Sequence, residues 1–314
     1  MSIRPSKEEL EKYSVDYSKD TDFSAFARLL QSKWRHEKGF EPLKYGNFIE
    51  VDFAKKSKSN FLTDNTKQIV ETTVAKGKKE GALISEPRIW NNLLSSQPLC
   101  FNLFAELSVD MNLATKFFKI LFPQTIDVVN KILFEYSPKR KSTEYTGDSS
   151  AFDVFVEYSN NKNETCFLGI EVKYAESLKE ETKIKAQDNF TNHKSDYERL
   201  TTNDYFITDA ISDLQKVPLA QIWRDHLLAI SMMHHSAKKY SEGSFVFLFP
   251  KQNSHCQKGV DDYQTYLVKN NSDKTKVGFY PMYLEKYIET LLSIYPNADN
   301  EHWTRELKKR YLGN

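Results

Sequence analysis

The stretch Ala151-Phe-Asp-Val-Phe-Val-Glu-Tyr158, followed by Cys166-Phe-Leu-Gly-Ile-Glu-Val-Lys-Tyr174, decides the fold of this chain. Both runs are rich in β-branched and aromatic residues and alternate with a period of two, which predicts strands. A third run with the same texture precedes them at residues 127–136. Clusters of Pro, Gly, Ser and Asn separate the three runs, so they predict an antiparallel meander.

Two carboxylates and one ammonium group lie on adjacent strands of this meander. Asp153 is near the start of the second strand, and the third carries Glu171, Val172 and Lys173. Side chains alternate along a strand, so we expect Glu171 and Lys173 on one face and Val172 in the other layer. Carboxylates of Asp153 and Glu171, with the carbonyl of Val172, are ligands that Mg²⁺ prefers. Lys173 would then orient or help deprotonate an attacking water, which favours metal-assisted phosphodiester hydrolysis.

The same residues also have a simpler interpretation. The Glu-x-Lys triplet occurs three times, starting at positions 171, 181 and 306. Glu and Lys two residues apart on a strand lie on one face and can merely neutralise one another. On spacing and strand context alone, a surface salt bridge and a metal site are both compatible with the pattern.

Helical patterns surround the meander. Apolar residues at steps of three and four, with Ser or Pro at several starts, predict helices at 23–34, 96–107, 112–122 and 218–233. The charged stretch 175–212 is also predicted to be helical, and further helices are predicted at 260–268, after Pro281, and at 303–312. Strands are expected at 243–250, which is continuously apolar and therefore buried on both faces, and at 276–280.

The order helix, three strands, helix, strand predicts an α/β fold with helical extensions. We predict a single domain over residues 1–314. Within it we expect a mostly helical N-terminal extension at 1–85, a core at 86–285 and C-terminal helices at 286–314.

Composition limits the partners. The chain has 314 residues, with 44 Lys and Arg against 43 Asp and Glu, so binding driven by bulk positive charge is excluded. Three widely spaced cysteines provide neither a disulfide framework nor a CxxC zinc site, as expected of a cytoplasmic protein. No apolar run approaches the length of a membrane span, and the first residues lack a signal-peptide pattern, so we expect no membrane partner.

The motif residues resemble those of the PD-(D/E)XK nuclease superfamily. Phe152-Asp153 and Gly169-Ile-Glu171-Val-Lys173-Tyr carry this resemblance, inside the element order given above. A bacterial group of nuclease-like proteins within the superfamily is similar at 93–104, 151–158, 170–174 and 221–229, and the likeness spans about residues 20–312. It implies a restriction-endonuclease-like core, which is a central mixed sheet flanked by helices.

The resemblance also implies roles for individual residues. The superfamily's aspartate falls on Asp153 and its Glu-x-Lys pair on Glu171 and Lys173. Phe152 occupies the position where Pro is usual, a departure that concerns turn geometry.

Additional site residues follow from the resemblance. Many members carry a further acidic residue; Glu106 on the first core helix and Glu135 on the first strand compete for this role. The long helix of several members directs a polar residue toward the site, and Gln221 matches that position. Arg224, on the same face, could reach a phosphate.

A basic cluster lies in the hairpin that leads to Asp153. It consists of Lys139, Arg140 and Lys141. Such clusters are most often solvated, but a hairpin leaning over the site would bring this one to a nucleic-acid backbone.

Two further motifs have structural interpretations. His226 lies on the buried stripe of its helix and is predicted to be a core histidine. The sequence Thr146-Gly-Asp-Ser-Ser150 offers a serine without a His partner, so a turn is the favoured interpretation.

We therefore expect a Mg²⁺-dependent nuclease acting on nucleic acid, with DNA as the expected substrate and Mn²⁺ as a substitute metal. The alternative is a non-catalytic nucleic-acid-binding or assembly protein that keeps the fold. A metal hydrolase of small substrates is a third interpretation. A homodimer remains open.

Overall fold

A mixed β-sheet forms the centre of the computed structural model, which describes residues 3–43, 45–178, 181–268, 276–294 and 298–313. Five strands in chain order make up the sheet in this part of the chain: β1 (Val128–Tyr136), β2 (Phe152–Ser159), β3 (Thr165–Val172), β4 (Glu242–Phe249) and β5 (Gly278–Tyr283). The first three are antiparallel, whereas β3, β4 and β5 run parallel. The predicted meander and mixed sheet are thus confirmed.

The prediction for Pro281 is wrong. We expected this residue to open a helix, but it lies inside β5 and pairs with Phe247 of β4. Among the described strands β5 is the last of the sheet, and an edge strand tolerates a proline that has no N–H to donate. Helix α12 (Leu284–Ile294) begins only after the strand ends.

One face of the sheet packs on the first helical layer. This layer contains α6 (Ser96–Val109), α7 (Met111–Leu121), α12 and α13 (Ala298–Tyr311). Alternate residues of β3, from Cys166 to Val172, are fully buried against it. Val172 therefore faces the layer opposite to Glu171, as the alternation predicted.

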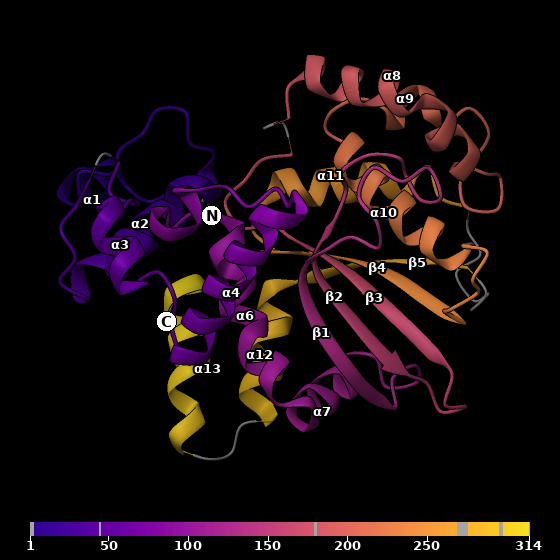
Figure 1. The fold of residues 1–314 in the computed structure, drawn as a ribbon. Helices are drawn as coiled ribbons and strands as arrows, with labels where there is room; N and C mark the ends of the chain where they lie inside the picture. The colour runs from indigo at the N-terminus through magenta and orange to yellow at the C-terminus, as the bar shows by residue number, and fades with distance from the viewer. Residues whose placement is uncertain (1–2, 44, 179–180, 269–275, 295–297, 314) are drawn as a thin grey trace.

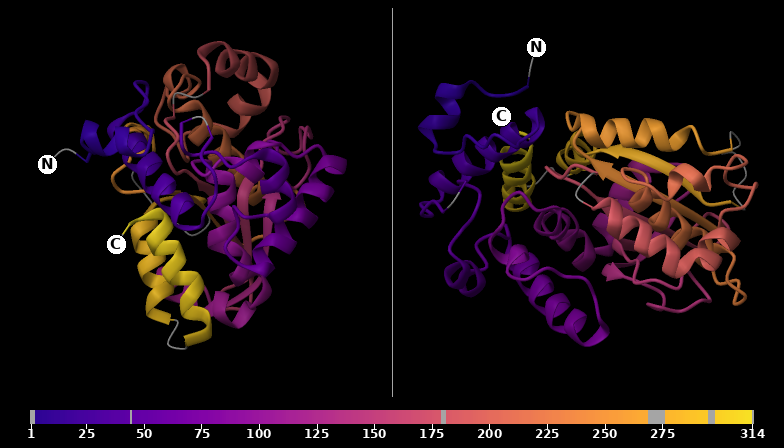
Figure 2. Two further views of the ribbon diagram at one scale, coloured as in Figure 1. Left: turned by 90° about the vertical axis from the view of Figure 1, so that its left-hand side faces the viewer. Right: turned by 90° about the horizontal axis from the view of Figure 1, so that it is seen from above.

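The other face carries the second helical layer. Three of its helices lie between β3 and β4 in the chain: α8 (Lys183–Leu200), α9 (Ile211–Leu214) and α10 (Ala220–Met233). The fourth, α11 (Ser254–Gln264), follows β4. Figure 1 shows this layer above the sheet and the first layer below it, and Figure 2 shows the sheet between them from other sides. The helix predicted at 260–268 in fact starts earlier and ends at Gln264.

His226 is a core residue of the second layer, as predicted. Its ring nitrogens lie 2.8 Å from the hydroxyl of Tyr263 and 3.3 Å from the carbonyl oxygen of Val277. Burial lowers the pKa of His226 to about 4. This histidine is therefore a neutral, hydrogen-bonded part of the interior.

The helical N-terminal segment precedes these layers. It includes α1 (Lys7–Lys12), α2 (Asp22–Glu37), α3 (Val51–Ser57), α4 (Asp64–Glu80) and the short α5 (Arg88–Asn91). Buried Gln31 of α2 donates hydrogen bonds to the hydroxyl of Tyr174 (3.1 Å) and to the carbonyl oxygen of Arg310 in α13 (2.8 Å). The first and last parts of the chain therefore meet beside the end of β3.

Among the described residues, no helix combines the length and the apolar character that a bilayer crossing requires.

Candidate active site

A cavity of about 480 Å³ opens where β2 begins and β3 ends. Asp153, Glu171 and Gln221 line it, and they come from β2, β3 and α10. Two further segments line the cavity. One is the β1–β2 loop (residues 137–151), with Arg140, Asp148, Ser149, Ser150 and Ala151. The other is the start of α8 and the residues just before it, with Glu181, Thr182, Lys185 and Asn189. Chain segments that are far apart in sequence therefore enclose the predicted motif residues.

Asp153 is fixed by the backbone of the neighbouring strand. Its Oδ2 accepts a hydrogen bond of 2.8 Å from the amide of Val172. Burial, then the negative charges of Glu171 and Glu135, raise the pKa of Asp153 well above its ordinary value. The carboxyl is held in place, and its environment favours the arrival of a positive charge.

Glu171, Lys173 and Gln221 form a closed ring of hydrogen bonds. Oε1 of Glu171 accepts from Nζ of Lys173 and from Nε2 of Gln221, both at 2.7 Å. Lys173 also donates to Oε1 of Gln221 at 3.0 Å. Sequence reasoning placed these three residues together, and the structure brings them together through direct contacts. The ion pair between Glu171 and Lys173 is thus present together with the carboxylate pair, but it is buried rather than on the surface as the simpler interpretation expected.

Lys173 stands just beyond the last residue of β3 and remains a cation. Burial lowers its pKa, but the carboxylates of Glu171, Asp153 and Glu176 outweigh burial and raise the pKa above its ordinary value. The residue is only 9% exposed, so its ammonium group depends on these partners for charge compensation.

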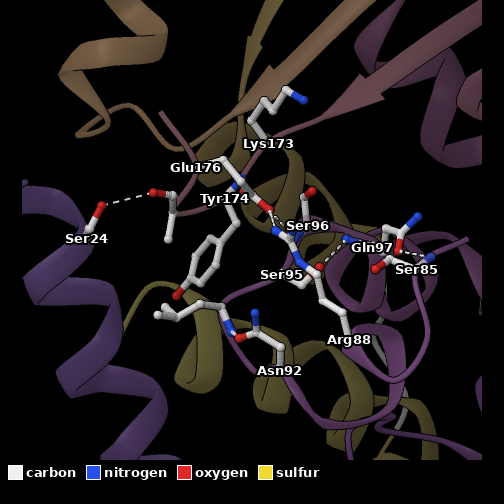
Figure 3. Close-up of polar contacts among 12 residues, drawn as sticks. Ser24, Ser85, Arg88, Asn92, Ser95, Ser96, Gln97, Lys173, Tyr174 and Glu176 are labelled. Carbon is white, nitrogen blue, oxygen red and sulfur yellow. Dashed lines mark hydrogen bonds and ion pairs between the residues drawn. The ribbon is translucent and has the colours of Figure 1, made fainter. Parts of the chain in front are cut away.

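The segment after Lys173 is anchored by Glu176. Its carboxylate accepts hydrogen bonds from the backbone amide of Ser96, at the first turn of α6 (2.7 Å), from Arg88 (3.2 Å) and from the amide of Tyr174 (2.9 Å). Figure 3 shows these contacts, with the side chain of Lys173 extending away from them. A carboxylate at a helix N-terminus is favourable, so Glu176 ties the end of β3 to α6.

Glu135 is the acidic residue of β1 that reaches the cavity. Its backbone has φ +50°, and it lies between the pairs that Phe134 and Tyr136 make with β2. Its Oε1 accepts a hydrogen bond of 3.2 Å from Gln97 of α6. Burial raises the pKa of Glu135 to about 7; Arg140 acts against this shift and Glu171 adds to it. The structure therefore brings Glu135 to the predicted site.

Glu106, the competing candidate, lies elsewhere. It accepts a hydrogen bond from Asn65 of α4 at an exposed position and is not among the residues that line the cavity. Asn102, on the same stripe of α6, is fully buried and donates to Tyr311 at 2.9 Å. This stripe serves the packing of α6 against α4 and α13, which explains why it carries polar residues.

Three acidic residues of the cavity were not named as site residues from sequence. Asp225 is 6% exposed and its Oδ2 has no hydrogen-bond partner among the described residues. Burial and the charge of Glu171 raise its pKa well above the ordinary value. Asp148 accepts hydrogen bonds from Ser150 and Tyr197, both at 2.7 Å, so the predicted turn also forms a cavity wall. Asp225 shares a helical face with positions 221 and 224, and this spacing could have indicated from sequence that it lies at the site.

Glu181, the third of these acids, neutralises the arginine predicted to bind phosphate. Arg224 donates to both carboxylate oxygens of Glu181, at 3.0 and 3.1 Å, and Asn189 donates a further hydrogen bond of 3.1 Å. Glu181 begins the second Glu-x-Lys triplet of the chain. Arg224 thus lines the cavity as expected, but its charge is already paired.

The predicted basic cluster is divided between the cavity and the surface. Arg140 lines the cavity, yet it donates to the carbonyl oxygens of Ser149 (2.8 Å) and Glu135 (3.0 Å) and so holds the β1–β2 loop. Lys139 is exposed and pairs with Glu144 at 3.0 Å. Lys141 is exposed, with φ +61°. One of the three predicted basic residues therefore reaches the cavity.

Carboxylates outnumber cations around the cavity. Six acidic and three basic side chains line it: Glu135, Asp148, Asp153, Glu171, Glu181 and Asp225 against Arg140, Lys185 and Arg224. Among the described residues no three His, Cys, Asp or Glu side chains are already grouped as a metal site. The excess of hard oxygen donors is nevertheless the chemistry that divalent cations such as Mg²⁺ select.

Phe152 replaces the usual Pro with a packing role. Its ring lies over Gly169 of β3, where an added Cβ would approach the ring to 2.4 Å. Phe152 is fully buried in the second layer and thereby fixes the start of β2 directly before Asp153.

Comparison with known proteins identifies the family. Comparisons with the curated proteins and with the solved structures give no match. The model of the PD-(D/E)XK nuclease superfamily matches residues 18–313, which is nearly the whole chain and includes the N-terminal helices from α2 onward. The resemblance, the restriction-endonuclease-like sheet and the matched family model agree: the chain belongs to the PD-(D/E)XK nuclease superfamily.

Proposed function

We propose that this protein is a Mg²⁺-dependent nuclease that hydrolyses phosphodiester bonds of DNA. The observation that supports this most directly is the joint presence of Asp153 and Glu171 in one cavity, with Lys173 held 2.7 Å from Glu171. Nucleases of this superfamily typically use divalent metals, and the chain's membership favours a nucleic acid as substrate.

The residues present fit a divalent cation. One oxygen of each carboxylate is used: Oε1 of Glu171 by Lys173 and Gln221, and Oδ2 of Asp153 by the amide of Val172. The other oxygen of each carboxylate accepts no hydrogen bond from the described residues. We assign these two oxygens and the carbonyl of Val172 as ligands of Mg²⁺ or Mn²⁺. A cation bound there would supply Lewis-acid activation of the scissile phosphate.

The hydrogen bonds of Lys173 support a positioning role. Its ammonium group is held by Glu171 at 2.7 Å and by Gln221 at 3.0 Å, so we assign it to orient the attacking water and to offset the charge that develops on the phosphate. Gln221 holds Lys173 and Glu171 in register through one hydrogen bond to each. Glu135 adds a carboxylate on the β1 side of the cavity.

Substrate contacts are assigned to the basic residues around the cavity. A phosphate that binds Arg224 would compete with Glu181, because both carboxylate oxygens of Glu181 accept hydrogen bonds from Nη2 of the guanidinium group. Arg140 lines the cavity, and Lys139 and Lys141 lie exposed on the β1–β2 loop. We propose that these residues contact the DNA backbone beside the cut.

Cleavage of plasmid, linear duplex, single-stranded DNA and RNA with Mg²⁺, Mn²⁺ or EDTA tests this function. Asp153→Asn, Glu171→Gln and Lys173→Ala should each reduce DNA cleavage by about 100-fold or more, because each removes a ligand or a charge at the reacting phosphate. Lys308→Ala is the matched control, since it changes the exposed lysine of another Glu-x-Lys triplet, on α13.

Three outcomes separate the candidate functions. Metal-dependent cleavage that all three variants lose supports the nuclease. Cleavage that persists unchanged in Asp153→Asn and Lys173→Ala contradicts the assigned site. DNA binding without cleavage under any metal favours the non-catalytic nucleic-acid-binding protein.

A further inference from the structure

A second cavity of about 660 Å³ lies between α4 and the free edge of β1. Thr72, Thr73 and Lys76 of α4 line one side, and residues 132–136 of β1 line the other. Among the described strands β1 pairs only with β2, so its outer edge carries no strand partner. Figure 1 shows α4 beside β1 at this edge of the sheet. We call this space the α4–β1 groove.

The groove continues the carboxylate cavity. Glu135 and Arg140 line both spaces, which therefore meet at these two residues. The left-handed backbone at Glu135 lies at this junction, and the pairs on either side of it continue to β2. A strand that occupies the carboxylate cavity would therefore have the groove as its neighbour at the edge of β1.

The groove has the chemical character of a strand-binding surface. Lys76 lines the groove, is 68% exposed and forms a 3.7 Å ion pair with Glu80, which lines the groove as well. Lys79 is exposed in the last turn of the same helix, just outside the residues that line the groove. Phe134 and Tyr136 are half-buried rings in the opposite wall. Lysines that follow a backbone and rings that contact bases are the two features of single-strand binding surfaces.

The rings of the groove are held rigidly. Phe134 stacks on buried Phe101, with centroids 4.6 Å apart, and Tyr136 stacks on buried Phe155, with centroids 4.2 Å apart. Rings fixed in this way lose little entropy when they bind a ligand. A peptide strand added at β1 would require neither these rings nor the lysines, which favours a nucleic acid as the occupant.

We propose that the α4–β1 groove binds the single-stranded continuation of the DNA strand whose scissile phosphate lies in the carboxylate cavity. This inference rests on the proposed nuclease function. It adds a substrate class: a strand whose bases are unpaired beside the cut, such as single-stranded DNA or the overhang of a duplex.

Binding to labelled oligonucleotides tests the groove separately from catalysis. Fluorescence anisotropy is measured with Asp153→Asn protein and Mg²⁺. The probes are single strands of about 4 and about 16 nucleotides, which span the usual site sizes of single-strand-binding folds, and a blunt duplex of the longer sequence. Lys76→Glu with Lys79→Glu reverses the charge of the groove lysine and of its exposed neighbour on α4, and Thr73→Phe reduces the volume of the groove without changing its charge.

The control is Lys258→Glu with Lys286→Glu. Lys258 forms an i,i+4 ion pair with Asp262, as Lys76 does with Glu80, and Lys286 is exposed like Lys79. Reversing the charges of Lys76 and Lys79 should weaken binding of the long strand about tenfold and reduce its salt slope, with less than about a twofold effect on the short strand. Thr73→Phe should also weaken the long strand, and the control should leave both strands unchanged.

Each outcome bears on one of the two proposals. Unchanged binding of the long strand in both groove variants, or an equal loss for the short strand, overturns the groove. A blunt duplex bound as tightly as the long single strand, with the same loss, overturns the single-stranded substrate. A length-dependent loss in a protein that cleaves no DNA would leave the groove standing and remove the nuclease function. Failure to bind any of these oligonucleotides would overturn both.

Discussion

Glu135 links the backbone of β1 to the charge of the cavity. The left-handed φ of +50° is rarely adopted by residues other than glycine, and here it occurs at a half-buried acid with a pKa of about 7. Backbone strain and an unfavourable charge at one residue are costs that proteins retain at functional sites. At this residue, therefore, stability and the proposed activity conflict.

Glu135→Gln should stabilise the metal-free protein at pH 8. The folded pKa of about 7 exceeds the ordinary value of 4.5, so ionising Glu135 costs more free energy in the folded state than in the unfolded state. Above pH 7 this difference lowers the free energy of unfolding. The variant removes this cost, which we expect at about 1–2 kcal/mol after allowance for the partial exposure of the side chain. As pH falls from 7 to 4.5, wild-type Glu135 becomes protonated and the gain disappears.

Urea unfolding of wild type and variant at pH 8 and pH 5, with EDTA present, measures this difference. Glu106→Gln is the control, because it changes an acidic residue outside the cavity. Between pH 6.5 and pH 4, His226 is protonated in the unfolded state but stays neutral in the folded state, because its folded pKa is about 4. This lowers the stability of both proteins equally, so it cancels in the comparison. Equal stabilisation at both pH values would contradict the assigned ionisation.

At the scale of elements, α8 and α10 are joined across the cavity. The ion pair between Glu181 and Arg224 is largely buried on both sides, and Tyr197 of α8 holds Asp148 of the β1–β2 loop at 2.7 Å. The start of α8 and the loop therefore form connected walls. A phosphate that binds Arg224 would compete with Glu181 for its positive charge.

Glu181→Gln should increase DNA affinity. The substitution keeps the shape of the side chain but removes the negative charge that competes with a phosphate for Arg224. We expect about a three- to tenfold tighter Kd for DNA, measured by anisotropy in the Asp153→Asn background, with a steeper salt dependence. Arg224→Gln should weaken binding in the same assay and abolish the gain in the double variant.

Glu198→Gln provides the comparison on the same helix. Glu198 pairs with Lys194 on an exposed part of α8, so its replacement changes net charge equally without touching Arg224. A similar gain in both variants would mean that net charge alone governs affinity. No gain in Glu181→Gln would remove Arg224 from the phosphate-binding residues.

The periodicity of strands explains which of these features the sequence revealed. Alternation along β2 and β3 was sufficient to place Asp153, Glu171 and Lys173 together and Val172 in the other layer. The pairing of Arg224 with Glu181 could not be predicted, because it joins two segments through tertiary packing. The orientation of Glu135 also depends on a single left-handed residue, which no periodic pattern encodes.

Edge strands limited the prediction in another way. Pro281 carries a strong helix-start signal, yet β5 lies at the end of the sheet and accepts a residue without an N–H. The position of a strand within its sheet decided this case. That position depends on the whole fold rather than on the local sequence.

At the scale of the whole molecule, Arg310 joins the two ends of the chain. This fully buried arginine of α13 donates hydrogen bonds to Gln31 and Asn60, and its guanidinium group lies 4.1 Å from the ring centroid of Trp34. Residues from α2 to α13 share one apolar cluster with the sheet. Contacts therefore cross the divisions predicted at residues 85 and 285.

Arg310→Lys should consequently destabilise the entire molecule. Lysine cannot reproduce the guanidinium hydrogen bonds and leaves buried acceptors at Asn60 and Gln31 unsatisfied, at an expected cost of about 2–4 kcal/mol in the free energy of unfolding. Tryptophan fluorescence and circular dichroism should report the same urea midpoint in wild type, and both midpoints should fall together in the variant. Lys308→Ala, an exposed change on α13, should leave both unchanged. If fluorescence lost its transition earlier than circular dichroism in wild type, the N-terminal helices would unfold separately, and the site at the end of β3 would not depend on them.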